Sequence, residues 1–352
     1  MKPRFAPPPE WSRVETIDAH TAGEPLRVIT AGWPELPGDT ILAMRRYAEQ
    51  HHEALRRALM WEPRGHADMY GCILTEPVTP DGDVGVLFLH NAGYSTMCGH
   101  GIIGLVKVGL ECCLLDPDRL EADETGRPIV RIDTPAGRVT ATAHPGAGGD
   151  PRRVERVSFR NVPSFVLQAD SDVDVPGFGV VRCDIAFGGA FYAYVDAADL
   201  GLELVPESSA RLIDAGRRVK RAVTEQVPIV HPAGADDLNF LYGTIFVGPG
   251  RGGAHSRNVC VFAEGEVDRS PTGTGVSGRA ALHHFRGELA PGETITIESI
   301  IGSSFDVSVV EETRVGPVPA VIPEVTGTAH ITGRHEFLID PDDPLREGFF
   351  LR

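Results

Sequence analysis

The sequence predicts an α/β fold built from two similar halves. Strand-like runs mix with amphipathic helical stretches along the whole 352 residues. A glycine-rich turn that opens an apolar helix also occurs once in each half. These turns read CGHGIIG from Cys98 and TGTGVSG from Thr272, and their glycines match position by position. They lie 174 residues apart, close to half the chain, so an internal duplication is the simplest explanation.

The first half is expected to contain two helices. One runs from Asp39, a plausible N-cap, to Met60, with apolar residues at helical spacing. The other follows the Cys98 turn and is apolar on all sides. The predicted strands of this half are residues 14–20, 25–31, 84–90 and 129–134. Each is short and rich in β-branched or apolar residues.

The second half repeats this order after a Gly- and Pro-rich segment, residues 144–153, which is the best candidate linker. We expect an amphipathic helix from about Glu207 to Glu225 and an apolar helix after the Thr272 turn. The predicted strands are residues 154–160, 191–196, 241–247 and 258–264. The chain is therefore divided into a first half, 1–150, a second half, 151–327, and a C-terminal tail, about 328–352, that can pack back on the first half.

The charge balance narrows the class of partner. The chain carries 33 basic and 49 acidic side chains, a net charge of −16. Nucleic-acid binders need clustered Lys and Arg, and anionic membrane surfaces repel an acidic protein. We therefore expect neither a nucleic-acid nor a membrane partner, and a small molecule as the substrate.

The compartment is expected to be the cytoplasm. The N-terminal residues hold no apolar run of the kind that a signal peptide needs. The longest apolar stretch, residues 101–115, is short for a bilayer span and contains Lys107 and Glu111. The six cysteines are scattered, without a CxxC pair or the density of a disulfide scaffold. A reducing environment fits this usage best.

No cofactor or metal is predicted. The only lysines are Lys2 in the N-terminal tail and Lys107 and Lys220 within predicted helices, which disfavours a pyridoxal phosphate Schiff base. The histidine pairs 51–52 and 283–284 lack the further ligands of a zinc site.

Both turns also match GxGxxG, but a dinucleotide site requires an apolar strand directly before the glycines. Polar residues, 94–96 and 268–270, stand there instead. The glycines more simply let backbone N–H groups approach an anion at a helix start.

Cys98 is the candidate catalytic base. It stands where the first apolar helix begins, and the positive end of a helix dipole is expected to lower the thiol pKa and populate the thiolate. The matching position of the other half is Thr272, an alcohol far too weakly acidic for the same task.

Four segments carry a resemblance to a known family: residues 17–25 (IDAHTAGEP), 90–101 (HNAGYSTMCGHG), 188–196 (GGAFYAYVD) and 261–275 (VFAEGEVDRSPTGTG). The chain resembles the proline racemase family over nearly its whole length. The resemblance implies the fold of diaminopimelate epimerase, with strands curled around a central helix in each half and the active site between the halves. It also implies no cofactor, a homodimer, and two cysteines that flank the substrate α-carbon.

The sequence departs from the racemases at Thr272, where they have the second cysteine. This Cys/Thr pair resembles the branch that dehydrates trans-3-hydroxy-L-proline. Inversion at a carbon needs a base on one face and an acid on the other. With Cys98 alone, a β-hydroxyl can leave instead, and the enamine rearranges to Δ1-pyrroline-2-carboxylate. Thr272 is expected to hydrogen-bond the departing hydroxyl or its water.

The resemblance also assigns roles to neighbouring residues. It places the substrate carboxylate on the backbone N–H groups of Gly99, His100, Gly273 and Thr274. It places the ring nitrogen between Asp268 and the His100 side chain. Phe191 and Tyr192 are expected to line the pocket.

Two alternatives stay open. One is a hydroxyproline 2-epimerase or proline racemase that works with one thiol. The other is a non-catalytic binder of a small imino or amino acid, which would have no need of the Cys98 thiolate.

Overall fold

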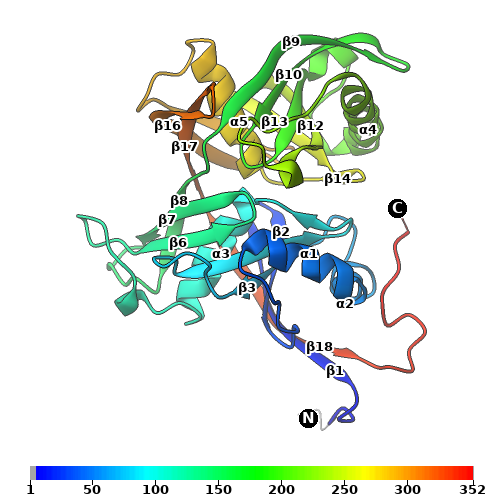
Figure 1. Cartoon of the computed structure of the whole chain (residues 1–352), viewed down its shortest axis with the longest axis vertical. Helices are drawn as coiled ribbons and strands as arrows, with labels where there is room; N and C mark the ends of the chain where they lie inside the picture. The colour runs from blue at the N-terminus through cyan, green and yellow to red at the C-terminus, as the bar shows by residue number, and fades with distance from the viewer. Residues whose placement is uncertain (1–4, 352) are drawn as a thin grey trace.

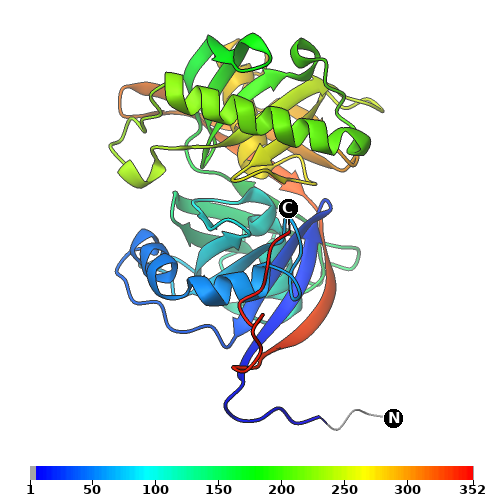
Figure 2. The same ribbon diagram turned by 90° about the vertical axis from the view of Figure 1, so that its right-hand side faces the viewer.

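The computed structural model describes residues 5–351 and consists of two stacked halves (Figure 1). The lower half in that view contains the first part of the chain, and the upper half contains the middle and most of the later part. Figure 2 shows α4 across the outer face of the upper half and α1 and α2 on the outside of the lower half. Among the described residues, none of the helices is long and apolar enough to span a membrane.

The first half surrounds helix α3 with strands. Its helices are α1 (Ile41–His51), α2 (Glu53–Met60) and α3 (Gly99–Glu111). Its strands are β1 (Ser12–Thr21), β2 (Glu24–Ala31), β3 (Tyr70–Thr75), β4 (Val84–His90), β5 (Tyr94–Ser95), β6 (Ile129–Thr134), β7 (Gly137–Pro145), β8 (Val154–Arg160) and, from the far end of the chain, β18 (Ala329–Ile339).

The second half surrounds helix α5 in the same way. Its helices are α4 (Ser209–Gln226) and α5 (Gly273–Phe285). Its strands are β9 (Phe165–Val175), β10 (Gly179–Phe187), β11 (Phe191–Asp196), β12 (Leu241–Pro249), β13 (Ser256–Phe262), β14 (Glu266–Val267), β15 (Thr294–Glu298), β16 (Ser304–Val315) and β17 (Val318–Gly327).

The strand pairing confirms the predicted duplication. In the first half β1–β2 is antiparallel, β2–β3 parallel, β3–β4 antiparallel, β4–β6 parallel and β6–β7 antiparallel. The series β10–β11, β11–β12, β12–β13, β13–β15 and β15–β16 repeats these orientations in the same order. Strands β8 and β17 hold equivalent places and pair antiparallel with each other, which joins the two halves through backbone hydrogen bonds.

The chain crosses between the halves later than the sequence suggests. The Gly- and Pro-rich segment 144–153 is not a linker: residues 146–153 connect β7 and β8, which pair antiparallel. Strand β8 packs on α3 and so belongs with the first half. The crossing lies between β8 and β9, and the return lies between β17 and β18, which pairs with β1. We accordingly divide the halves after Arg160 and after Gly327.

The two central helices, α3 and α5, are buried over most of their length. In α3, Ile102, Ile103, Val106 and Leu110 are all fully buried, as expected for a helix enclosed by sheet. Helices α1, α2 and α4 bury one face only. The single helix predicted from Asp39 to Met60 is wrong in two details. It breaks at His52 into α1 and α2, and its N-cap is Thr40, whose hydroxyl accepts the Ala43 N–H at 3.1 Å.

Candidate active site

The N-termini of α3 and α5 meet at a cavity between the halves. The cavity is narrow in this structure, with a volume of about 20 Å³. The cavity is lined by Tyr70, Met97, Cys98, Gly99, His100, Tyr192, Tyr242, Phe262, Asp268, Thr272, Gly273 and Thr274. All the site residues predicted from the sequence except Phe191 therefore lie around one space, and their individual roles stay predictions.

The two helix starts direct partial positive charge toward the cavity. Each α-helix leaves its first N–H groups without partners inside the helix and carries partial positive charge at that end. Helices α3 and α5 begin in contact, through Gly99 and Gly273. A carboxylate placed between them would meet N–H groups from both halves at once.

Cys98 is the N-cap of α3, and its sulfur is the acceptor of the Gly101 N–H at 3.2 Å. This bond lowers the thiol pKa, as the sequence predicts. Burial is the larger effect, however, and the charge of Asp268 adds to it. Together they raise the pKa of Cys98 well above its ordinary value. The expectation of a lowered thiol pKa is therefore wrong, because the sequence does not reveal how completely the helix start is enclosed.

The His100 ring lies against this thiol, with Nδ1 3.2 Å from the Cys98 sulfur. Burial lowers the pKa of His100 to about 3, so the imidazole is neutral at neutral pH. The Pro25 carbonyl opposes that shift by accepting a hydrogen bond from the ring. A neutral imidazole donates through one nitrogen only, so the other is left as an acceptor toward the thiol.

Asp268 supplies the acidic side chain of the cavity. Burial raises its pKa to about 6, even though the Ser270 N–H donates to Oδ1 at 2.7 Å and the Thr272 hydroxyl also favours the ionised form. At neutral pH the group is mostly a carboxylate. It can therefore attract a cationic amine at the mouth of the two helices.

Thr272 occupies the place in α5 that Cys98 has in α3, but in a different backbone conformation. Its φ is +70°, which is strained for a β-branched residue, whereas the φ of Cys98 is −146°. The Ser270 hydroxyl accepts the Thr272 N–H at 3.1 Å and helps to hold this geometry. The Thr272 hydroxyl is buried and makes no well-formed hydrogen bond among the described residues, although it lies near enough to Asp268 and Cys260 to lower the pKa of both.

Aromatic side chains close the cavity. Tyr192 is in contact as predicted, with its hydroxyl 2.7 Å from the Thr274 hydroxyl. Phe191 does not line the cavity; it packs on Phe187 and His231 in the core, because successive strand residues point to opposite faces. Sequence reasoning missed Tyr70, Met97, Tyr242 and Phe262.

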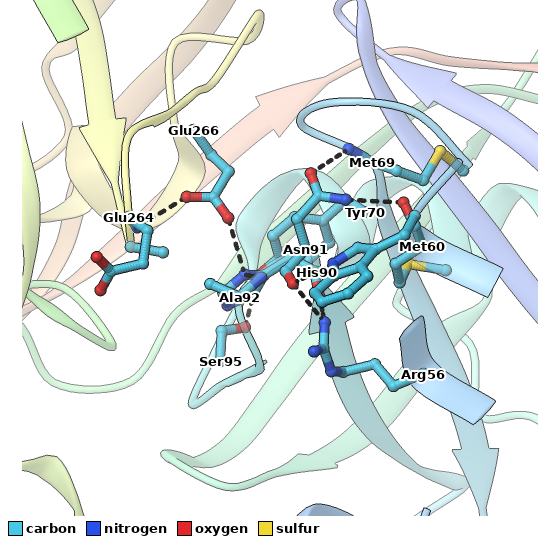
Figure 3. A network of polar contacts seen from close by, with 12 residues as sticks. Arg56, Met60, Met69, Tyr70, His90, Asn91, Ala92, Ser95, Glu264 and Glu266 are labelled. Carbon is cyan, nitrogen blue, oxygen red and sulfur yellow. Dashed lines mark hydrogen bonds and ion pairs between the residues drawn. The ribbon is translucent and has the colours of Figure 1, made fainter. Parts of the chain in front are cut away.

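Tyr70 is held by a second layer of polar contacts (Figure 3). Its hydroxyl lies 2.6 Å from the Ser95 hydroxyl, and the His90 ring stacks on its ring. His90 Nδ1 is 3.7 Å from a carboxylate oxygen of Glu266, which belongs to the other half. The buried Arg56 guanidinium donates to the main-chain carbonyl of His90 from behind. These contacts orient the aromatic wall and join the halves beside the cavity.

No group of three or more His, Cys, Asp or Glu side chains within residues 5–351 is arranged to hold a metal ion. The paired histidines of α5 have other contacts: His283 lies 2.7 Å from both Glu288 and Arg279.

The chain is similar over its length to proteins with assigned activities. A protein of Colwellia psychrerythraea named trans-3-hydroxy-L-proline dehydratase is 50% identical, with 96% of this chain and 93% of that protein covered. The Homo sapiens protein of the same name is 46% identical over 99% of this chain and 98% of its own. A Burkholderia multivorans protein named 3-hydroxyproline 2-epimerase is 47% identical, with 96% of this chain and 98% of that protein covered.

Solved structures agree with the fold. The hydroxyproline epimerase of Agrobacterium vitis, with bound trans-4-hydroxy-L-proline, matches with a TM-score of 0.87 and 32% identity, covering 97% of this chain and 96% of that one. A PhzF-family protein of Bacillus anthracis matches at 12% identity with a TM-score of 0.55, which supports the two-half α/β fold alone. The proline racemase family model matches residues 16–350. The chain therefore belongs to the proline racemase family.

Proposed function

We propose that this protein dehydrates trans-3-hydroxy-L-proline to Δ1-pyrroline-2-carboxylate. The observation that carries the proposal is the unlike pair at the two helix starts, a thiol at Cys98 and an alcohol at Thr272 around one cavity. The dehydratase names of relatives such as the Colwellia psychrerythraea protein support it.

The substrate carboxylate binds between the helix starts, on the N–H groups of Gly99, His100, Gly273 and Thr274. The ring ammonium lies near Asp268, whose carboxylate is retained at neutral pH. This arrangement pairs both charges of the zwitterionic substrate inside the protein. Pairing the ammonium with Asp268 also offsets one of the charges that raise the pKa of Cys98.

Cys98 removes the α-proton as a thiolate. The neutral His100 ring, with Nδ1 3.2 Å from the sulfur, contacts the group that becomes this thiolate and helps to orient it. The enclosed cavity excludes water, so the charges that develop on the substrate interact with the helix starts rather than with solvent.

The stereochemistry of the substrate then assigns the next proton transfer. At C2 the hydrogen and the carboxylate point to opposite faces of the ring. The 3-hydroxyl is trans to the carboxylate, so it shares the face of the α-hydrogen. Cys98 therefore faces both leaving groups. The thiolate takes the proton from C2, the electron pair forms the C2–C3 double bond, and the new thiol protonates the departing hydroxide to give water.

This geometry revises the expected role of Thr272. The threonine stands at the other helix start and so faces the opposite side of the ring, away from the departing hydroxyl. Because an alcohol there delivers no proton, the α-carbon is not reprotonated with inversion. The enamine released by the elimination rearranges to the cyclic imine.

A 2-epimerase is the second candidate, and the name of the Burkholderia multivorans relative favours it. Incubation with 3-hydroxyproline, 4-hydroxyproline and proline isomers, followed by chiral chromatography and detection of the cyclic imine, separates the two. We expect imine from trans-3-hydroxy-L-proline and no D-isomer from the others. Efficient interconversion of epimers without imine would replace the dehydratase by the epimerase, and binding without any product would leave a binder.

The proposal includes a cytoplasmic location and a homodimer. All six cysteines are free thiols, which fits a reducing compartment. The homodimer is an expectation from the family resemblance, and light scattering on the purified protein tests it. Both thiol-bearing and alcohol-bearing turns lie on one chain, so activity does not require a partner copy to supply site residues.

A further inference from the structure

The segment IDAHTAGEP forms the turn between β1 and β2, directly behind the active site. The Thr21 hydroxyl donates to the His100 carbonyl at 2.8 Å, and the Pro25 carbonyl accepts from the His100 ring. His20 braces the turn itself, since its Nδ1 accepts the Gly23 N–H at 3.2 Å. Asp18 of this segment pairs with Arg27, which leaves Glu24, to which no step above gives a role.

Glu24 reaches across from the first half to the second. Its side chain is completely buried, and Oε2 accepts the main-chain N–H of Arg269 at 2.7 Å. Arg269 stands between Asp268 and Thr272, in the loop that leads into α5. Glu24 therefore holds the loop that carries two site residues. Its other oxygen, Oε1, is buried without a hydrogen-bond partner among the described residues.

The charges around Glu24 oppose its ionisation. Asp268 and Asp68 raise its pKa, as burial does most strongly, while Arg269 lowers it. The Arg269 guanidinium is itself engaged, at 2.7 Å from Asp68 and donating to the Val267 carbonyl at 2.9 Å. The Cys98 and Cys260 thiols also lie near Glu24. A negative charge on Glu24 would raise the pKa of both thiols.

We propose that Glu24 is a positioning residue that acts as a neutral carboxylic acid. It fixes the Asp268–Thr272 loop against the first half and leaves Asp268 as the carboxylate that faces the substrate amine. The identity of the substrate amine rests on the proposed function, whereas the burial of Glu24 and its hydrogen bond to Arg269 do not depend on it. An ionised Glu24 would hold a full negative charge away from water and near the Asp268 carboxylate, and protonation removes both of these costs.

Neutrality of Glu24 also favours the chemistry at Cys98. A second negative charge near the sulfur would make the thiolate harder to form. A neutral Glu24 thus anchors the loop of the second half without raising the pKa of Cys98 in the first half.

Three variants test the proposal. Glu24→Gln keeps the oxygen that accepts the Arg269 N–H and is permanently neutral, whereas Glu24→Ala removes the anchor. Glu35→Gln, at an exposed loop position, is the matched control. We expect KM to rise about tenfold in Glu24→Ala, the effect of losing one buried hydrogen bond. Glu24→Gln should recover most of that loss.

The protonation state is read by two measurements that a purely structural role would not move. In infrared difference spectra at about pH 8, where Asp268 is ionised, wild type and Glu35→Gln should show a protonated-carboxyl band that Glu24→Gln lacks. On the acid side of the pH profile, kcat/KM should fall with the same midpoint pH in Glu24→Gln as in wild type. The proposal is wrong if the band is unchanged, or if the limb of Glu24→Gln moves to lower pH, which would show that an ionised Glu24 had been repelling Asp268.

A failure of the proposed function gives a different result. If wild type fails to dehydrate the substrate, the infrared comparison and titration with pyrrole-2-carboxylate still decide the state of Glu24 and its effect on binding. Weaker binding of this planar analogue to Glu24→Ala, restored in Glu24→Gln, would support the anchor. Equal binding by all three proteins would overturn it.

Discussion

Gly99 and Gly273 touch backbone to backbone where α3 and α5 begin: a Cβ added to Gly99 would lie 2.4 Å from the Gly273 Cα, and one added to Gly273 would lie 2.5 Å from the Gly99 Cα. Neither contact leaves room for a side chain, because the neighbouring atoms are backbone rather than a flexible side chain. Glycine at both positions is thus what lets the two helix starts come into contact.

A methyl group at this contact should hold the halves apart. We expect Gly273→Ala to remain folded but to raise KM at least tenfold, since the substrate carboxylate then loses donors from one helix start. Gly93→Ala, where the space around the added Cβ is open, is the control. Steady-state kinetics with circular dichroism check the prediction, and unchanged KM in Gly273→Ala would mean that close approach is dispensable.

Cys98→Ser should lose between a hundredfold and ten-thousandfold of kcat, because an alcohol is a much weaker base than a thiol. Thiol alkylation should also inactivate the protein, and pyrrole-2-carboxylate should protect it. The exposed Cys113 would react first, so the alkylation belongs in a Cys113→Ser background, which we expect to be active. Normal turnover by Cys98→Ser would exclude the proposed base.

Thr272→Cys should add an acid on the second face of the ring. We expect this variant to gain measurable epimerisation of 3- or 4-hydroxyproline, whereas Thr272→Ser, which keeps an alcohol, should gain none. Chiral chromatography of the products in deuterated water detects both inversion and deuterium at the α-carbon. Equal epimerisation by wild type would show that Thr272 does not prevent proton return.

The pH profile should report Asp268. Its pKa is raised to about 6, and the ionised form binds the amine, so kcat/KM should fall as the pH drops through about 6, tenfold per unit below it. Asp268→Asn should bind substrate weakly at every pH and lose this limb. A limb that persists unchanged in Asp268→Asn would belong to another group.

The site could be predicted from the sequence because several of its residues lie in short, recognisable motifs. Cys98 and Thr272 directly precede glycines whose spacing marks the two helix starts, and Asp268 stands shortly before Thr272 in the same motif. Tyr70, Tyr242 and Phe262 carry no such mark: each is an isolated aromatic residue on a strand, and only the sheet topology brings them to the cavity.

The sequence also could not predict properties that depend on the tertiary structure, such as a pKa or the pairing of two strands. The helix start at Cys98 predicts a lowered thiol pKa, but the enclosure by both halves reverses the sign. The Gly- and Pro-rich residues 146–153 resemble a linker locally, and only the pairing of β7 with β8 identifies them as a hairpin.

The return of β18 to the first half has a consequence for biosynthesis. Residues 329–339 complete the sheet around β1, but a ribosome makes them after every strand of the second half, at roughly 5–20 residues per second. The strands β9 to β17 can therefore associate while β1 still has a bare edge. The first half therefore completes its sheet only once residues 329–339 have been made, which is after all the strands of the second half.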